Sequence, residues 1–170
     1  MRSFHALYER VLAEAVGKEP VRVVFVCMGN TDRSPMAETI ARKMLAGRAV
    51  VTSAGCKKGG RPSSDNAQMM MKKIGLDCSG HVSRQLDAQI VAENDLVVFL
   101  DRWVADQYRM FVPKGKLVVC AVGNPAKNDP KQFMDAAITI GVKLRKTVVP
   151  LVQRLYDYKN KPVSPIRKSG

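Results

Sequence analysis

The sequence predicts an α/β fold: a single-domain, open, mainly four-stranded parallel sheet flanked by helices. Between Val21 and Arg154, short apolar runs alternate with longer stretches in which apolar residues recur at helical spacing. This alternation is typical of a parallel sheet covered by helices. The chain has 170 residues, 46% of them hydrophobic, which is enough for one ordinary core.

Strands are predicted at the apolar runs, at residues 22–27, 50–53, 95–100 and 116–122. Helices are predicted between them and after them, at residues 35–45, 64–74, 87–92, 102–110 and 130–158. The last helix is long for a globular protein, and Gly141 or Pro150 should bend or split it.

The core domain is predicted at residues 20–158, with an extension at each end. Apolar residues recur at three- and four-residue spacing near the start, so residues 1–19 are expected to form an N-terminal amphipathic helix extension. Residues 159–170 contain two prolines and four basic residues and are expected to be a mobile basic tail.

The pattern of apolar residues predicts a cytoplasmic protein. The longest apolar runs, at residues 23–28, 96–100 and 117–122, are far shorter than the roughly 18 residues of a membrane span. The first 17 residues lack the uninterrupted apolar stretch of a secretory signal. The four cysteines form no C-x-x-C pair, so they are expected to be free thiols in a reducing compartment.

Charge is the anomaly of the composition. The chain carries 28 Lys and Arg against 15 Asp and Glu, a formal net charge of +13. Such an excess indicates an anionic partner, which is a nucleic acid, a membrane surface or a phosphorylated substrate. A basic surface that serves only solubility is the alternative interpretation.

The informative segment is the loop after the first predicted strand, Cys-Met-Gly-Asn-Thr-Asp-Arg-Ser-Pro from Cys27 to Pro35. Ser34 is expected to be the N-cap of the next helix, with Pro35 in its first turn. A loop that wraps over a helix N-terminus aims backbone N–H groups inward and forms an anion cradle. Arg33 adds a fork of donors that can hold two phosphate oxygens. Cys27 lies on the floor of this positive field and is expected to be a thiolate nucleophile.

The string from Cys27 to Glu38 resembles the motif of the low-molecular-weight protein tyrosine phosphatase family, Cys-x-Gly-Asn-x-Cys-Arg-Ser-Pro-Met-Ala-Glu, with Asp32 at the position of the second cysteine. The resemblance covers roughly residues 21–155. It continues at Ser53-Ala54-Gly55, at Gly80-His81 and Ser83-Arg84-Gln85-Leu86, at Phe99-Leu100-Asp101 and at Asp129-Pro130.

This resemblance implies a role for each matching residue. Cys27 would attack phosphorus, Arg33 would bind the transferring phosphoryl group, and Asp129 would protonate the leaving atom and then activate water. The phosphate would be bound by the loop residues Met28, Gly29, Asn30, Thr31, Asp32 and Ser34. Asn30, Ser34 and His81 would form a hydrogen-bonded frame. No metal and no cofactor are expected, because the loop itself stabilises charge at phosphorus.

Three departures from the family pattern bear on the substrate. Phosphotyrosine-specific members line the cleft with an aromatic residue in the loop after Ser-Ala-Gly and a tyrosine pair after Asp-Pro, where this sequence has residues 56–60 (Cys-Lys-Lys-Gly-Gly) and 131–133 (Lys-Gln-Phe). The aromatic walls are therefore expected to be absent, and each ring contact contributes roughly 0.5–1.5 kcal/mol. Thr31 is typical of the protein-arginine phosphatase branch. Asp32 replaces a cysteine that can protect the nucleophile from oxidation, and its carboxylate is expected to point away from bound phosphate.

The leading functional hypothesis is a phosphatase acting on protein phosphotyrosine, with a protein-arginine phosphatase as the alternative. The partner would be a phosphorylated protein or a small anionic phosphate, not a membrane, with nucleic acid disfavoured and the oligomeric state undetermined. Arsenate reduction is disfavoured, because residues 99–110 hold no cysteine. A further alternative is a catalytically weak phosphate- or nucleic-acid-binding module. Asp129-Pro130 has its own simpler interpretation as the start of a helix.

Overall fold

The structure is a computed structural model that describes residues 17–162. The predicted N-terminal helix lies outside the described residues except for residues 17–19, and so does the predicted tail from residue 163 onward.

Four parallel strands form one sheet in the order β2-β1-β3-β4, and this confirms the predicted fold class. The strands are β1 (Val21–Cys27), β2 (Ala49–Gly55), β3 (Leu96–Phe99) and β4 (Leu117–Val119). The register pairs Cys27 with Gly55 and Val26 with Phe99. The loops that follow β1, β2 and β3 therefore meet at the carboxyl edge of the sheet.

The last strand is shorter than predicted. Beyond Val119, the chain still follows β3 through two backbone hydrogen bonds, from Cys120 N–H to the Phe99 carbonyl (2.8 Å) and from Val122 N–H to the Leu100 carbonyl (3.0 Å). β3 itself ends at Phe99, so the ladder stops while the chain continues beside it.

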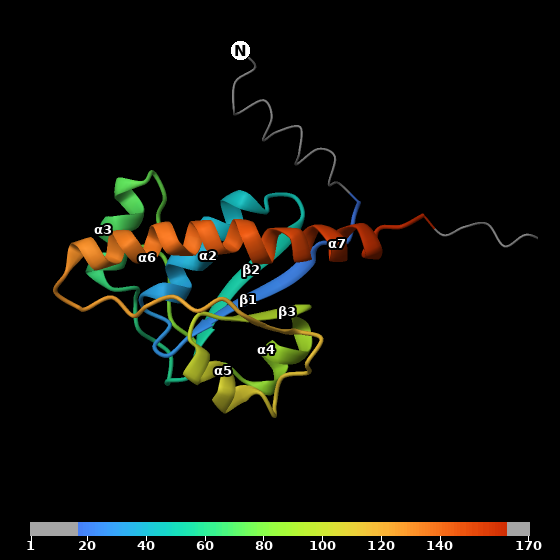
Figure 1. The fold of residues 1–170 in the computed structure, drawn as a ribbon, viewed down its shortest axis with the longest axis horizontal. Helices are drawn as coiled ribbons and strands as arrows, with labels where there is room; N and C mark the ends of the chain where they lie inside the picture. Colours follow the sequence, from blue (N-terminus) through green and yellow to red (C-terminus); the bar gives the residue numbers. More distant parts are fainter. Residues whose placement is uncertain (1–16, 163–170) are drawn as a thin grey trace, which may run out of the picture.

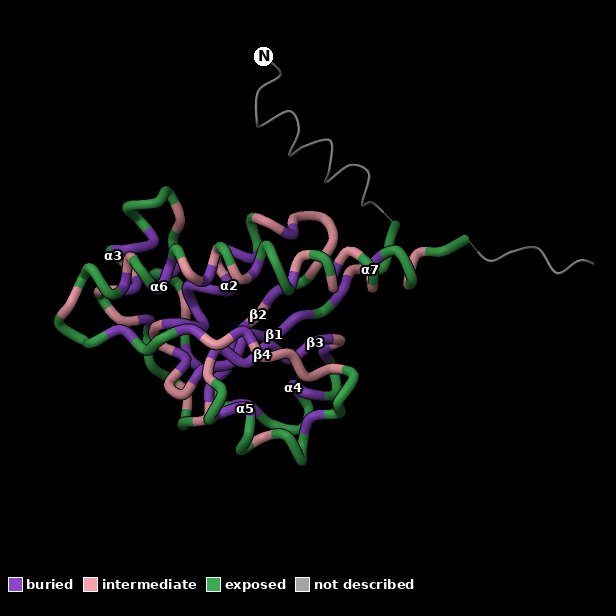
Figure 2. Tube along the Cα trace, in the orientation of Figure 1, coloured by how far each residue is buried: buried purple, intermediate pink, exposed green. Residues whose placement is uncertain are grey.

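Helices cover both faces of the sheet (Figure 1). One face carries α2 (Arg33–Met44), α3 (Asp65–Lys73), α6 (Pro130–Lys143) and α7 (Val149–Lys159), and the other carries α4 (Ala88–Glu93) and α5 (Arg102–Tyr108). Successive residues of β1 point to opposite faces, so Phe25 packs in the first core and Val24 in the second. Figure 2 shows that β1 and β3, the central strands of the sheet, form the buried centre of the molecule.

The predicted C-terminal helix is one continuous rod in Figure 1, but it is split by a π-helical turn at Leu144–Val148. Pro150 lies just after this turn and has no N–H to donate to the carbonyl four residues earlier, that of Lys146. The preceding N–H, that of Val149, donates to the Leu144 carbonyl five residues back, which is the hydrogen bond of a π turn. Of the two positions at which the helix was predicted to bend or split, Gly141 lies within α6 and the interruption lies next to Pro150. Within residues 17–162, no helix has both the length and the apolar character needed to cross a membrane.

Candidate active site

The loop between β1 and α2 places a buried thiol against a hydroxyl. Cys27 is 3% exposed, and its Sγ lies 3.0 Å from the Oγ of the fully buried Ser34. The N-cap of α2 is Asp32, so the prediction that Ser34 would be the N-cap was wrong. Because the helix begins at Arg33, the Ser34 hydroxyl lies in the first turn and faces the thiol.

Asn30 closes the loop from inside. Its φ of 52° lies in the left-handed region, which asparagine tolerates better than most residues. Its Nδ2 donates to Ser34 Oγ (2.8 Å) and to Ser53 Oγ (2.9 Å), while its Oδ1 accepts from the Arg84 N–H (2.9 Å). Ser34 Oγ thus accepts from Asn30 and lies within hydrogen-bond distance of both the Cys27 sulfur and the Ala54 carbonyl oxygen (3.5 Å).

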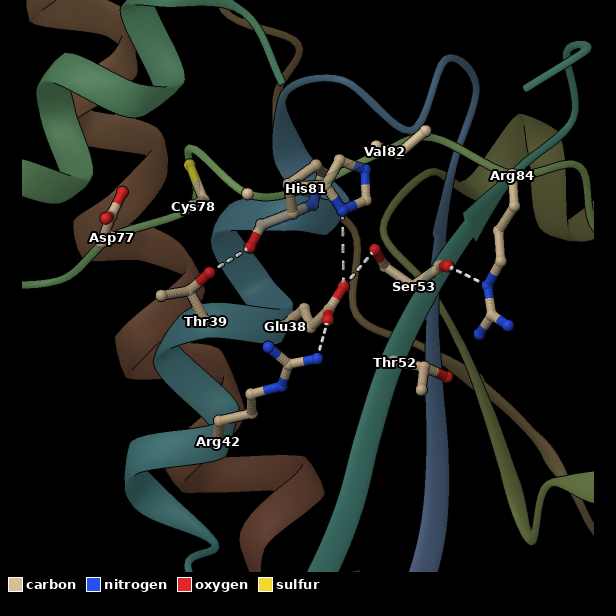
Figure 3. Close-up of a pocket in the computed structure, with 12 residues that line it drawn as sticks. Glu38, Thr39, Arg42, Thr52, Ser53, Asp77, Cys78, His81, Val82 and Arg84 are labelled. Atoms are coloured by element: carbon tan, nitrogen blue, oxygen red, sulfur yellow. Dashed lines mark hydrogen bonds and ion pairs between the residues drawn. The ribbon is translucent and has the colours of Figure 1, made fainter. Parts of the chain in front are cut away.

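A buried carboxylate supports this frame from behind. Figure 3 shows Glu38 of α2 between Ser53, His81 and Arg42 at the wall of a cavity of about 370 Å³. Ser53 donates to Glu38 Oε2 (2.5 Å), and Arg42 pairs with the other oxygen. His81 Nδ1 lies 3.8 Å from Glu38, and its Nε2 lies 2.9 Å from the Asn30 carbonyl oxygen. His81 therefore contacts the loop, as its predicted supporting role requires.

Arg33 is buried, with 4% exposure, and its guanidinium is only partly satisfied. Its Nη1 donates to the Leu100 carbonyl (3.3 Å), to Asp101 Oδ2 (3.0 Å) and to the Val122 carbonyl (2.9 Å). Its Nε has no partner within residues 17–162. A buried donor without a partner is unfavourable by about 1–3 kcal/mol. An oxyanion in the loop is the kind of ligand that would satisfy it.

Asp101 is the partner of Arg33 that the sequence motifs did not reveal. It is also the N-cap of α5, since it accepts from the Val104 N–H (3.3 Å). Burial opposes its ionisation, but the hydrogen bonds from Arg33 and Val104 outweigh burial and lower the pKa of Asp101. Strand register could have indicated this contact. Phe99 pairs with Val26 at the start of the loop, and Asp101 comes two residues after Phe99.

Asp32 is turned toward the N-terminus of α3. Its Oδ1 accepts from Ser64, the N-cap of α3, and its Oδ2 accepts from Thr31 Oγ1 (3.2 Å). The backbone repeats the link, because Ser64 N–H donates to the Thr31 carbonyl (2.8 Å). The carboxylate that holds Arg33 is thus Asp101, and Asp32 ties the loop to α3 instead.

A cleft of about 620 Å³ adjoins the loop on this side. Its lining includes Thr31 and Asp32 from the loop, Arg61, and Lys127 with Asn128 from the segment before α6. Arg61 Nη2 donates to the Gly29 carbonyl (3.2 Å), so a second guanidinium lies directly over the loop. Further exposed basic side chains follow β2 and begin α6, namely Lys57, Lys58 and Lys131, and together with Arg61 and Lys127 we call them the basic rim.

Gly59, in the loop after β2, has no room for a side chain. A Cβ on Gly59 would lie 2.4 Å from the Ser83 carbonyl oxygen and 2.7 Å from Arg84 Cα. Both are backbone atoms that cannot move aside cheaply. Position 59 therefore cannot carry an aromatic residue in this packing, and the aromatic residue that does line the cleft, Phe133, is only 2% exposed.

Asp129 lies in the position that the simpler interpretation predicted, as N-cap of α6. Its Oδ1 accepts from the N–H groups of Lys131 (2.9 Å) and Gln132 (3.2 Å), and its Oδ2 accepts from Gln132 Nε2 (2.9 Å). The Gln132 N–H, then its side-chain amide, lower the pKa of Asp129. Within residues 17–162, no hydrogen bond or ion pair joins Asp129 to Cys27 or Arg33.

The geometry agrees with what similarity to known proteins shows. The family described as low molecular weight phosphotyrosine protein phosphatase matches residues 22–135. The chain is 34% identical over 79 residues to the probable low molecular weight protein-tyrosine-phosphatase EpsP of Ralstonia nicotianae, and this match covers 46% of the chain but only about half (54%) of that relative. It is 31% identical over 125 residues to arsenate reductase 2 of Staphylococcus saprophyticus, covering 73% of this chain and 93% of the relative.

Solved structures share the fold. A low molecular weight protein tyrosine phosphatase from T. tengcongensis superposes with a TM-score of 0.70 at 28% identity, covering 76% of this chain and 99% of that one. The YwlE arginine phosphatase from Geobacillus stearothermophilus superposes with a TM-score of 0.72 at 23% identity, covering 85% and 100%, a likeness that concerns the fold alone. With the Cys27–Arg33 loop closed over α2 and the family match extending from β1 into α6, the chain belongs to the low molecular weight phosphotyrosine protein phosphatase family.

Proposed function

We propose that the protein is a cysteine-dependent protein tyrosine phosphatase that works through a cysteinyl-phosphate intermediate on Cys27. One observation carries the proposal: a buried thiol 3.0 Å from a serine hydroxyl shares its loop with a buried arginine whose Nε has no partner among residues 17–162. Hydrolysis of a chromogenic aryl phosphate, with release of inorganic phosphate, tests it. A full chain that binds phosphate but releases none from the aryl ester would contradict it.

In the first step, the Cys27 thiolate attacks phosphorus, the P–S bond forms and the bond to the leaving oxygen breaks. Arg33 and the loop N–H groups stabilise the charge on the phosphoryl oxygens. Asp129 gives its proton to the leaving oxygen. In the second step, Asp129 takes a proton from water, the water oxygen attacks phosphorus, and the P–S bond breaks to restore the thiolate and release phosphate.

Asp129→Asn should reveal the proton donor through the leaving group. Hydrolysis of phenyl phosphate, whose leaving group needs a proton, is expected to slow by about 10²–10⁴-fold, the usual contribution of a general acid. Hydrolysis of p-nitrophenyl phosphate should slow much less, because its leaving group departs as an anion. Steady-state kcat/KM for both esters, which reports the first chemical step and not the later attack of water, provides the measurement. Equal losses on the two esters would assign Asp129 to α6 structure alone.

A protein-arginine phosphatase is the second candidate, and the geometry of the cleft favours it. Thr31 and Asp32 offer a small polar side chain and a carboxylate beside the loop, and the one aromatic residue in the lining of the cleft, Phe133, is only 2% exposed. Comparison of a phosphoarginine peptide with a phosphotyrosine peptide of equal flanking sequence decides between the two. Arsenate reduction is not proposed. A reductase that passes electrons through a relay of thiols would need two further cysteines near the end of β3, and residues 99–110 contain none.

A cytoplasmic location is part of this proposal. Its support is the state of the thiols, since Cys27, Cys56, Cys78 and Cys120 are all free. A free nucleophilic thiol persists in a reducing compartment.

The basic rim is expected to select acidic phosphopeptides. Arg61 and Lys127 line the cleft together with two carboxylates, Asp32 and Asp65. Lys57 and Lys58 are also exposed, so basic side chains outnumber acidic ones. At low salt, kcat/KM for an acidic phosphopeptide should exceed that for a neutral one by about three- to tenfold, and this advantage should vanish near 1 M salt, where the Debye length is about 3 Å.

Two matched substitutions locate this effect. Arg61→Gln should reduce the preference for acidic peptides, whereas Arg145→Gln, an exposed arginine on the π turn, should leave it unchanged. Equal kcat/KM values for the two peptides, or a preference that salt does not alter, would show that the rim takes no part in selection.

A further inference from the structure

The turn that carries Asp129 is held by a side chain to which family resemblance gives no role. Gln132 stands three residues after Asp129, the spacing at which the side chain of a helix N3 residue reaches back to the N-cap. Its Oε1 accepts from the Ala126 N–H (2.9 Å) and its Nε2 donates to Asp129 Oδ2 (2.9 Å). One amide therefore bridges the beginning and the end of the turn, which is closed by a further bond from Asp129 N–H to the Ala126 carbonyl (3.0 Å).

These contacts occupy three of the roughly four acceptor sites of the carboxylate. Oδ1 takes the Lys131 and Gln132 N–H groups, and Oδ2 takes the Gln132 amide. Every partner is a donor, and hydrogen bonds donated to a carboxylate favour its ionised form. A proton on Oδ2 would weaken the bond from the Gln132 amide. The cap and the proton donor thus favour opposite states of one side chain.

We propose that Gln132 is a positioning residue that clamps Asp129 in its ionised, helix-capping state and so limits the reactions that need its proton. The proposal rests on the proposed role of Asp129 as general acid. Its chemical consequence is a preference for phosphoryl compounds with good leaving groups, such as activated aryl phosphates, over esters of weakly acidic alcohols.

Charge contributes to the same balance. Lys131, exposed in the first turn of α6, acts on Asp129 through its positive charge as well as its N–H. The two groups can be separated, because a charge effect at an exposed site weakens with salt whereas a hydrogen bond does not. Lys131→Gln is therefore the matched control for Gln132→Leu. The Gln132→Leu substitution keeps the backbone N–H and replaces the amide by a shorter apolar side chain.

The experiment measures kcat/KM for phenyl phosphate and p-nitrophenyl phosphate against pH in the full chain. Gln132→Leu is expected to raise kcat/KM for phenyl phosphate at neutral pH by about threefold, because more of the enzyme carries the proton, and to move the alkaline limb of the profile to higher pH. kcat/KM for p-nitrophenyl phosphate should stay the same. Lys131→Gln should give a smaller shift that disappears at high salt.

Two further measurements keep the outcomes distinct. In an Asp129→Asn background, Gln132→Leu should have no effect on either ester. An NMR titration of the Asp129 carboxyl should show a higher midpoint in Gln132→Leu even if the turn loosens and activity falls. An unchanged midpoint, or equal changes on both esters, overturns the role of Gln132. If Asp129→Asn instead lowers activity equally for both esters, the assignment of Asp129 as general acid is overturned.

Discussion

Cys27→Ser is expected to abolish turnover while the loop continues to bind phosphate or vanadate. A serine hydroxyl is a much weaker nucleophile than a thiolate, and loss of a covalent nucleophile lowers kcat by about 10⁴-fold or more. Binding should persist because the groups that shape the loop remain, notably Asn30 with its bonds to Ser34 and Ser53. Steady-state kinetics and vanadate titration measure the two properties separately.

Cys56→Ser is the matched control. Cys56 lies at the end of β2, beside the loop, where its N–H donates to the Met28 carbonyl (3.0 Å), but no contact among the described residues gives it a part in the chemistry. This variant should retain most of the activity. Turnover by Cys27→Ser close to that of the native chain would end the covalent mechanism.

Arg33→Lys is expected to lower kcat/KM by about 10²–10³-fold, the usual effect of losing one preorganised donor to transition-state charge. The guanidinium has two functions in this account. Its Nη1 donates to Leu100, Asp101 and Val122 behind the loop. Its Nε has no partner in the described chain and is the donor that the oxyanion would use. A lysine ammonium is a single point of charge, so it can satisfy the acceptors behind the loop or an oxyanion within it, not both.

Asp101→Asn is the companion to this variant, because it keeps Arg33 but removes the charge that holds Nη1. Its loss of kcat/KM should be smaller than that of Arg33→Lys, since two carbonyls still fix the guanidinium. An Arg33→Lys enzyme with native kcat/KM would show that catalysis does not use the Arg33 Nε donor.

The sheet and its helices follow from local pattern. β1 is an apolar run in the sequence because both faces of the strand are buried. Pro150 interrupts the last helix because a proline within any helix lacks the N–H of one backbone hydrogen bond. The start of α2 was misassigned because Asp32 and Ser34 are both good N-cap residues two positions apart. The bonds of Ser34 to Asn30 and Cys27 decide between them, and those depend on the closed loop.

The support of the loop could not be predicted in the same way. Asp101 reaches Arg33 only because β3 lies beside β1 in one register, and Ser53 reaches Glu38 only because β2 packs under α2. Such contacts join residues far apart in sequence. The cap at Asp129 is local, and Gln132 stands at capping-box spacing, so that interaction could have been found from the sequence.

Rapid acid quench of the Asp129→Asn enzyme during turnover of p-nitrophenyl phosphate, followed by peptide mass spectrometry, tests the covalent mechanism most directly. Slower attack of water should let the intermediate accumulate in this variant. The predicted result is one phosphoryl group on the peptide that contains Cys27, and none when Cys27 is replaced by serine. Phosphate release without any protein-bound phosphoryl group, or a phosphoryl group on another residue, would contradict the mechanism.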